Sequence, residues 1–167
     1  PTRASAKQTK KNKTTLKIER YFTQKYTDPW QGVELVLTNS QITDAEGKIV
    51  SEMKEVEVPK HWSQLAVDIL VSKYFRRSGV PGTGHETSIK QVISRITQTL
   101  GRFGLEQGYF DSDSGRVFEN ELTHLLLYQM GAFNSPVWFN LGIYQAYGIT
   151  GSGGSYAWSF DEQKPVR

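Results

Sequence analysis

The 167-residue sequence contains no cysteine, and this absence excludes several kinds of chemistry. Without cysteine the chain forms no disulfide, holds no metal through thiolates and has no cysteine nucleophile. The sequence also lacks any apolar run close to the ~20 residues that span a bilayer, and no signal peptide is recognisable at its start. These absences favour a cytoplasmic protein without a membrane-spanning segment.

The length suits one domain with a hydrophobic core, and the charge is unevenly distributed along it. Residues 1–20 contain seven basic residues and one acidic residue, so this part carries +6 and the remainder −3 of the net +3. We predict that residues 1–19 form a basic, disordered tail, because they are poor in apolar residues. Such a tail binds nucleic acid or an acidic partner through charge, although it lacks the aromatics that stack on bases.

Residues 20–60 are predicted to form an extended arm with a small β-hairpin or meander. An apolar residue at every second position is typical of a half-buried strand, and one such face carries Val33, Leu35 and Leu37. Residues 44–47 predict a turn in which Gly47 adopts a positive φ. The apolar residues after this turn predict one or two returning strands that end at Pro59.

Residues 61–130 are predicted to form a helical domain. The first helix starts near Trp62 and is apolar over most of its surface, so we expect it to be largely buried. Residues 80–88 contain two glycines and a proline and raise the alternative of a phosphate loop. They lack the spacing of a dinucleotide or P-loop motif, so a turn before the next helix is favoured.

Two further helices are predicted in this domain. Ser88 and Gln91 have the spacing of a capping box, and the helix that follows has one apolar face, made by Ile89, Val92, Ile93, Ile96 and Leu100. We expect Gly101 and Gly104 to end it. Residues 111–115 resemble part of a calcium loop, but the required glutamate is not in register, so they predict a turn and the cap of a third helix. The three histidines have no ligand spacing, and no metal site is predicted.

Residues 131–140 place three aromatic residues around an Asn-Ser-Pro step. Ser135 followed by Pro136 predicts the N-cap and first position of a helix that continues to Gly148. Free N–H groups at a helix start suit an anion such as phosphate, although Pro136 removes one donor. The alternative is a capped helix with buried aromatics, and the residue types leave both interpretations open. The glycine- and serine-rich residues 151–160 also carry aromatics, which predicts that they pack against further structure.

Three separated motifs together resemble the N-terminal region of class II ribonucleotide reductases, the adenosylcobalamin-dependent enzymes. They are Val58-Pro59-Lys60-His61-Trp62-Ser63-Gln64-Leu65-Ala66, Lys73-Tyr74-Phe75-Arg76-Arg77-Ser78-Gly79-Val80-Pro81 and Gly131-Ala132-Phe133-Asn134-Ser135-Pro136-Val137-Trp138-Phe139-Asn140. The resemblance covers about residues 20–160. It implies a mainly α-helical N-terminal region with a small β-hairpin or meander, followed over residues 131–167 by the truncated beginning of the ten-stranded α/β barrel.

The resemblance also implies a role for the Asn-Ser-Pro step. The family residue that matches Ser135 lies at the phosphate end of the ribonucleotide substrate, and Asn134 and Pro136 are expected to shape the same pocket. The implied activity is that of a ribonucleoside-diphosphate reductase with a thioredoxin-type acceptor, although the matched residues leave di- and triphosphate substrates open. A thioredoxin-like reductant and a possible homodimer are the implied partners of the whole enzyme.

The chemistry of this family requires a cysteine thiyl radical, which adenosylcobalamin generates and which abstracts a hydrogen from the ribose. A chain without cysteine lacks the thiols of that reaction, and the resemblance implies that the family's catalytic Asn and Glu also lie downstream of the matched region, so no catalytic residue is expected here. We therefore expect a fragment, or one half of a split enzyme completed by the C-terminal remainder of the reductase, that is inactive alone. The alternatives are a non-catalytic nucleic-acid or protein docking module that uses the basic tail, and a truncated product with no independent role.

Overall fold

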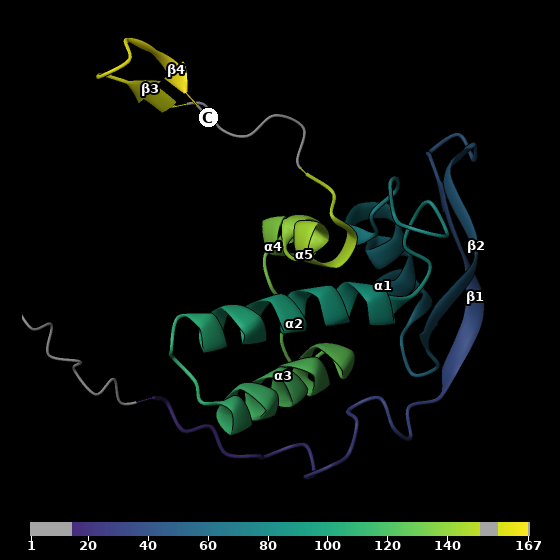
Figure 1. Ribbon diagram of the computed structural model, residues 1–167. Helices are drawn as coiled ribbons and strands as arrows, with labels where there is room; N and C mark the ends of the chain where they lie inside the picture. The colour runs from purple at the N-terminus through teal and green to yellow at the C-terminus, as the bar shows by residue number, and fades with distance from the viewer. Residues whose placement is uncertain (1–14, 151–156, 167) are drawn as a thin grey trace, which may run out of the picture.

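The computed structural model describes residues 15–150 and 157–166, and two packed helices form its centre. Figure 1 shows the longest helix lying between a second long helix on one side and two short helices on the other. In chain order these four are α2 (Ile89–Glu106), α3 (Ser112–Leu127), α4 (Ser135–Asn140) and α5 (Ile143–Tyr147).

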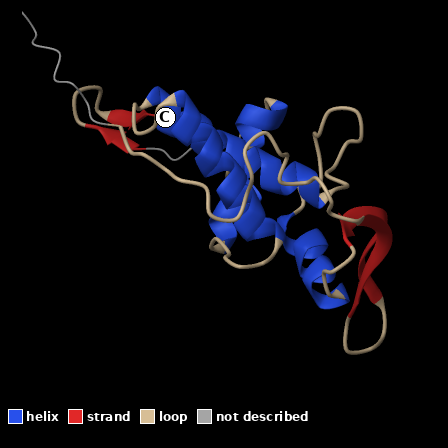
Figure 2. Ribbon diagram, turned by 90° about the horizontal axis from the view of Figure 1, so that it is seen from below, coloured by secondary structure: helices blue, strands red, loops and turns tan. Residues whose placement is uncertain are grey.

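The predicted β-hairpin is confirmed. Strands β1 (Leu35–Thr43) and β2 (Ile49–Pro59) pair antiparallel and lie at one end of the helices (Figure 2). The predicted turn joins them, with the carboxylate of Asp44 accepting hydrogen bonds from the backbone N–H groups of Glu46 and Lys48. Pro59 is the last residue of β2, as expected.

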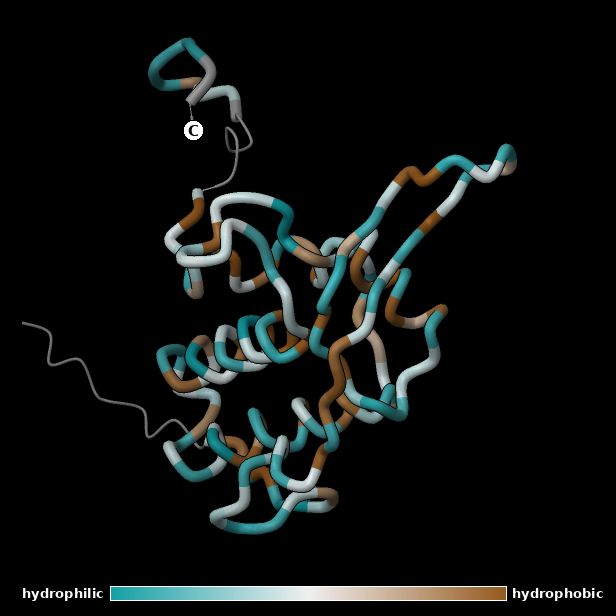
Figure 3. Tube along the Cα trace, turned by 90° about the vertical axis from the view of Figure 1, so that its right-hand side faces the viewer, coloured by the Kyte–Doolittle hydropathy of each residue, from teal (hydrophilic) through white to brown (hydrophobic). Residues whose placement is uncertain are grey.

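The predicted inward face of β1 is wrong by one residue. Leu37 is 66% exposed, whereas Val36 and Thr38 pair with the buried Val58 and Val56 of β2. Strand β2 determines which face of β1 is buried, because the buried valines of β2 pack on the helices. Val36 is apolar and can therefore occupy the buried face of β1 as well as Leu37 could. Beyond the core the hairpin projects from the body (Figure 3), and its apolar residues Ile49 and Val50 are exposed there.

The first predicted helix is more exposed than expected. Helix α1 (Gln64–Ile69) starts after the N-cap residue Ser63 and passes into a π-helical turn, η1 (Leu70–Tyr74). The N–H of Phe75 donates to the carbonyl of Leu70 at 3.1 Å, five residues back, and the chain then becomes extended. One face of this helix is buried, but Leu65 is 70% exposed. The prediction that most of the helix surface is buried is therefore wrong.

Helix α2 confirms the predicted capping box and apolar face, but not the predicted end. Ser88 and Gln91 cap it reciprocally, and Ile89, Val92, Ile93 and Ile96 are fully buried. Gly101 and Gly104 lie inside the helix, where they allow close approach of the neighbouring structure. A Cβ atom on Gly104 would lie 2.2 Å from the ring of Phe110, and one on Gly101 would lie 3.3 Å from Glu119. The glycines are therefore packing positions.

Helix α3 starts as predicted, with the side chain of Asp111 accepting from the N–H of Ser114 at 2.7 Å. A segment preceding β1 runs beside this helix. The carboxylate of Glu121 accepts hydrogen bonds from the N–H groups of Phe22 and Thr23, each at 2.9 Å. We call residues 15–31 the strap. The predicted basic tail, residues 1–19, lies outside the described residues except for its last five.

Glu121 makes docking of the strap sensitive to pH. Burial raises the pKa of Glu121, but hydrogen bonds from Thr23 and from the backbone of Phe22 and Thr23 outweigh this, so its pKa lies below the ordinary 4.5. A depressed carboxyl pKa contributes stability above the unfolded value that is lost as the pH falls through the folded value. We expect the amide resonances of Phe22 and Thr23 to shift in NMR spectra as the strap releases below about pH 4.5.

The matched control for this titration is Glu121→Gln, which keeps the size of the side chain but does not ionise. In that variant the shifts of Phe22 and Thr23 should no longer follow the acid titration. An unchanged titration in Glu121→Gln would show that another group holds the strap.

The predicted single helix from Ser135 to Gly148 is wrong, because the chain turns between α4 and α5. Gly142 has φ 81°, and a Cβ atom there would lie 2.1 Å from the backbone oxygen of Arg95. The turn therefore requires glycine both for its conformation and for its contact with α2. Residues 151–156 of the predicted glycine- and serine-rich run lie outside the described residues. Strands β3 (Ala157–Ser159) and β4 (Lys164–Val166) pair antiparallel, and the beginning of a barrel stays a prediction.

Gly142 and Gly148 offer a matched test of this turn. Gly148 also has a positive φ, 68°, but a Cβ atom there would meet nothing within 4 Å. We expect Gly142→Ala to lower the free energy of unfolding by about 2–5 kcal/mol, the sum of backbone strain and overpacking. Gly148→Ala should cost only about 1–2 kcal/mol of strain. Urea unfolding followed by circular dichroism measures both, and equal losses would refute the contact with Arg95.

Within the described ranges, no helix is both long enough and apolar enough to cross a membrane.

Candidate functional site

The start of α4 carries the three residues predicted to contact a substrate. The predicted N-cap is wrong by one position, because Asn134 is the N-cap and Ser135 is the first helical residue. Pro136 follows, where its missing N–H costs no helical hydrogen bond. Asn134, Ser135 and Pro136 are all exposed, and the side chain of Asn134 makes no capping hydrogen bond. All three are therefore accessible to a ligand.

Tyr74 joins these residues from the end of η1. Its hydroxyl lies 3.2 Å from the hydroxyl of Ser135, and its ring stacks on that of Trp138 with centroids 5.9 Å apart. Sequence reasoning does not single out Tyr74, because its spacing fits the apolar face of a helix. Only the fold brings it within reach of a residue 61 positions away.

The short helix supplies few free backbone donors. The N–H groups of Val137 and Trp138 both donate to the carbonyl of Asn134, and Pro136 has none. Within residues 15–150 and 157–166, the N–H of Ser135 donates to no acceptor. Because α4 has only six residues, binding of an anion here would depend on the two hydroxyls and this single amide rather than on a long helix dipole.

An apolar cavity of about 230 Å³ lies next to this hydroxyl pair. Its wall includes the rings of Trp62, Tyr74, Phe133 and Trp138. The ring of Trp62 is held in place because its Nε1 donates to the carbonyl of Leu127 at 2.8 Å. The aromatic density noted in residues 131–140 therefore has a structural role, with Trp138 only 7% exposed.

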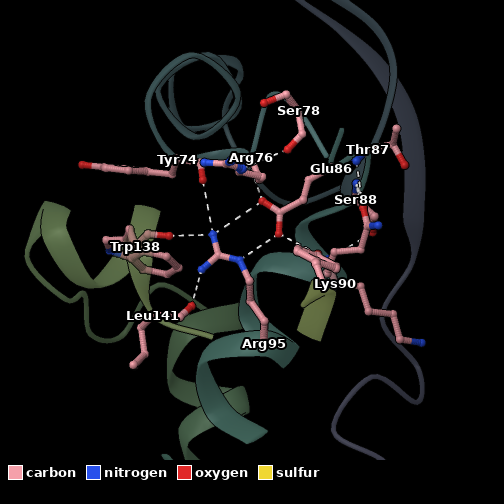
Figure 4. A network of polar contacts seen from close by, with 12 residues as sticks. Tyr74, Arg76, Ser78, Glu86, Thr87, Ser88, Lys90, Arg95, Trp138 and Leu141 are labelled. Carbon is pink, nitrogen blue, oxygen red and sulfur yellow. Dashed lines mark hydrogen bonds and ion pairs between the residues drawn. The ribbon is translucent and has the colours of Figure 1, made fainter. Parts of the chain in front are cut away.

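A buried ion pair lies behind the site (Figure 4). Arg95 of α2 donates from Nε to Oε1 of Glu86 at 2.7 Å, and the two side chains are 1% and 0% exposed. Glu86 lies in the loop before α2, and its second oxygen accepts from the N–H of Arg76 at 2.7 Å. The pair joins α2 to the loop that follows η1.

Arg95 has three further acceptors, all of them backbone carbonyls. Its Nη1 donates to Leu141 and its Nη2 to Trp138, each at 2.6 Å, and Nη2 also lies 3.3 Å from the carbonyl of Tyr74 (Figure 4). Leu141 and Trp138 belong to the C-terminal end of α4, where unpaired carbonyls favour a cation. One guanidinium group therefore holds the ends of both α4 and η1.

Tyr147 of α5 completes the shell around Glu86. Its hydroxyl donates to Oε1 of Glu86 at 2.7 Å. Burial, together with the hydrogen bond to the Glu86 carboxylate and its charge, raises the pKa of Tyr147, which therefore stays a donor. Sequence reasoning missed this network, because Arg95 lies at the edge of the apolar face of α2, next to Val92, where a charged residue is usually exposed.

Neutralising Glu86 should destabilise the fold strongly. Glu86→Gln leaves the guanidinium of Arg95 buried without its counter-charge, which costs about 3–5 kcal/mol in the free energy of unfolding. The exposed pair of Glu34 and Lys60, 2.8 Å apart, is the control. Glu34→Gln should change stability by less than about 1 kcal/mol. Urea unfolding at neutral pH compares the two variants, and similar losses would contradict an essential role of the buried pair.

Two of the three histidines stack on aromatic rings. His61 stacks on Tyr128 and His124 on Phe22, with ring centroids 5.2 and 5.1 Å apart. In the part of the chain that the structure describes, no group of three or more His, Cys, Asp or Glu side chains is placed to hold a metal ion. Asp111 is used as the cap of α3.

The fold defines a mainly helical region with a small antiparallel hairpin, and the site is an exposed hydroxyl pair beside an apolar cavity. A family profile described as class II vitamin B12-dependent ribonucleotide reductase matches residues 36–129, from β1 to just beyond α3. The chain belongs to this family and is an N-terminal region of such a reductase.

Curated relatives agree with the family match. Vitamin B12-dependent ribonucleotide reductases are 42% identical over 127 residues in Rhodopirellula baltica, 36% over 171 residues in Bradyrhizobium diazoefficiens and 42% over 150 residues in Streptomyces coelicolor. These alignments cover 75%, 83% and 85% of this chain, in the same order. They cover only 12%, 14% and 15% of the relatives, so the chain spans a small part of their length.

Proposed function

We propose that the chain is the N-terminal part of an enzyme that reduces ribonucleotides to 2′-deoxyribonucleotides for DNA synthesis. The family profile over residues 36–129 and the names of the relatives support this proposal. The substrate class is a ribonucleoside diphosphate, and a thioredoxin-like protein returns the reducing equivalents. Both features, like a homodimer, belong to the whole enzyme.

In this proposal, the chain provides structural support and one contact with the substrate phosphate. The observation that carries this role is the exposed hydroxyl of Ser135, placed 3.2 Å from that of Tyr74. Two hydroxyls at this separation both donate to one anionic oxygen once the hydrogen shared between them rotates toward it, and hydrogen bonds to charged groups are the stronger kind. Asn134 and Pro136 flank Ser135 and shape the pocket for the phosphate.

The radical chemistry must use residues outside this sequence. The chain contains no cysteine, so it supplies neither a thiyl radical nor a reducing thiol pair. We assign no catalytic residue to it. The C-terminal remainder of a reductase is the partner that supplies the thiols.

Adenosylcobalamin is the proposed cofactor of the whole enzyme, where it generates the radical. The apolar cavity beside Tyr74 does not fit it. A corrin ring with its amide side chains needs a broad binding surface, whereas the apolar cavity beside Ser135 measures about 230 Å³ and is walled by fixed aromatic rings. We therefore assign no residue of this chain to the cofactor.

Substitution of Ser135 tests the phosphate contact. In a complete reductase that contains this region, Ser135→Ala should raise the KM for the ribonucleotide roughly 10- to 100-fold, since a hydrogen bond to a charged group contributes roughly 1.5–3 kcal/mol. The kcat should change little, because the phosphate is remote from the reacting ribose carbon. Steady-state kinetics measure both constants.

Ser112→Ala is the control, since Ser112 is an exposed serine in the first turn of α3. It should leave KM unchanged. An unchanged KM in Ser135→Ala would remove Ser135 from the substrate site, and turnover by this chain alone would overturn the scaffold role.

A further inference from the structure

The buried ion pair of Glu86 and Arg95 is hydrogen-bonded, through Arg95, to both elements that carry the hydroxyls of the site. Tyr74 is the last residue of η1, and its carbonyl faces Nη2 of Arg95. The same residue presents its hydroxyl to Ser135. A displacement of Arg95 would therefore displace Tyr74, which is hydrogen-bonded to Ser135.

A second connection runs through α4. Arg95 donates to the carbonyls of Trp138 and Leu141, so it fixes the C-terminal end of the helix whose first residue is Ser135. The backbone of Arg95 also contacts Gly142, which limits how far α4 can slide along α2. The Trp138 ring, on the same helix, stacks on Tyr74. The two connections meet at the hydroxyl pair.

We propose that Arg95, oriented by Glu86, is a positioning residue that sets the separation and direction of the hydroxyls of Ser135 and Tyr74. This inference rests on the proposed phosphate contact of Ser135. Arg95 touches no substrate, since its side chain is 1% exposed. It acts because hydrogen-bond donors work on a charged oxygen only when they are already aligned.

The planar guanidinium is required for this role. Arg95 serves four acceptor groups in different directions: the Glu86 carboxylate and three carbonyls. A lysine ammonium keeps the charge opposite Glu86 but cannot reach all four groups, because it lacks the rigid fork of donors. Arg95→Lys therefore loosens α4 and η1 while it preserves the ion pair.

A double-mutant cycle in a complete reductase that contains this region distinguishes positioning from general stability. We expect Arg95→Lys alone to raise the ribonucleotide KM roughly tenfold, since misplacement by about 1 Å costs up to two orders of magnitude. The kcat should stay within about twofold. In the Ser135→Ala background, Arg95→Lys should have almost no further effect on KM, because the contact that it aligns is gone.

Thr123→Val is the control for lost stability. It breaks the buried hydrogen bond between the hydroxyls of Thr123 and Thr97, 3.3 Å apart, which joins α3 to α2 without touching α4. It should lower the Tm and leave KM unchanged. A rise in KM as large as that of Arg95→Lys would overturn the positioning role.

The remaining outcomes separate this inference from the proposed function. If Ser135→Ala leaves KM unchanged, the phosphate contact itself is wrong. If Ser135→Ala raises KM but Arg95→Lys does not, or if the two effects multiply, only the positioning role is wrong.

A milder variant covers the case in which Arg95→Lys does not fold. Tyr147→Phe removes one hydrogen bond to Glu86 and leaves both charges in place. It should raise KM by a smaller factor, roughly two- to fivefold, that also disappears in the Ser135→Ala background. A rise that persists in that background would overturn the proposal.

Discussion

A guanidinium group that is 1% exposed must find its hydrogen-bond acceptors within the protein, since water cannot supply them. Arg95 finds them in the Glu86 carboxylate and in carbonyls of η1 and α4. Glu86 in turn accepts from Arg76 and Tyr147. No buried side-chain nitrogen or oxygen of the described residues is left without a partner. The arrangement of η1, the loop before α2, α4 and α5 therefore depends on this pair.

Hydrophobic packing explains the rest of the fold but does not orient the site. The valines of β2, one face of α2 and the end of α3 share one core cluster, and glycines let α2 and its neighbours approach closely. Apolar contacts are not directional, so they tolerate small rotations of a short helix. The six-residue α4 places Trp138 in the core, and hydrogen bonds from Arg95 to its C-terminal end add a directional constraint.

Apolar packing for stability and directional hydrogen bonds for orientation are both consistent with an N-terminal region of a ribonucleotide reductase. The family match covers residues 36–129, which include Arg95, Glu86 and Tyr74, whereas Ser135 lies just beyond it. The matched region would therefore act as the rigid support for a substrate contact that follows it in the sequence. Since the chain has no cysteine, it supplies no thiol to radical chemistry, and the contribution that we propose for it is binding and alignment.

The sequence by itself determined the local structure: the hairpin and its turn, the capping box of Ser88 and Gln91, and the cap at Asp111. Each depends on residues within a few positions of one another, so local patterns suffice. Tertiary structure alone decided which face of β1 is buried, that Gly101 and Gly104 pack rather than end α2, and that α4 stops at the turn of Gly142. It also decided that Tyr74 meets Ser135 and that Arg95 meets Glu86. These outcomes depend on partners from other elements, and the directions in which those partners approach are not encoded in any local pattern.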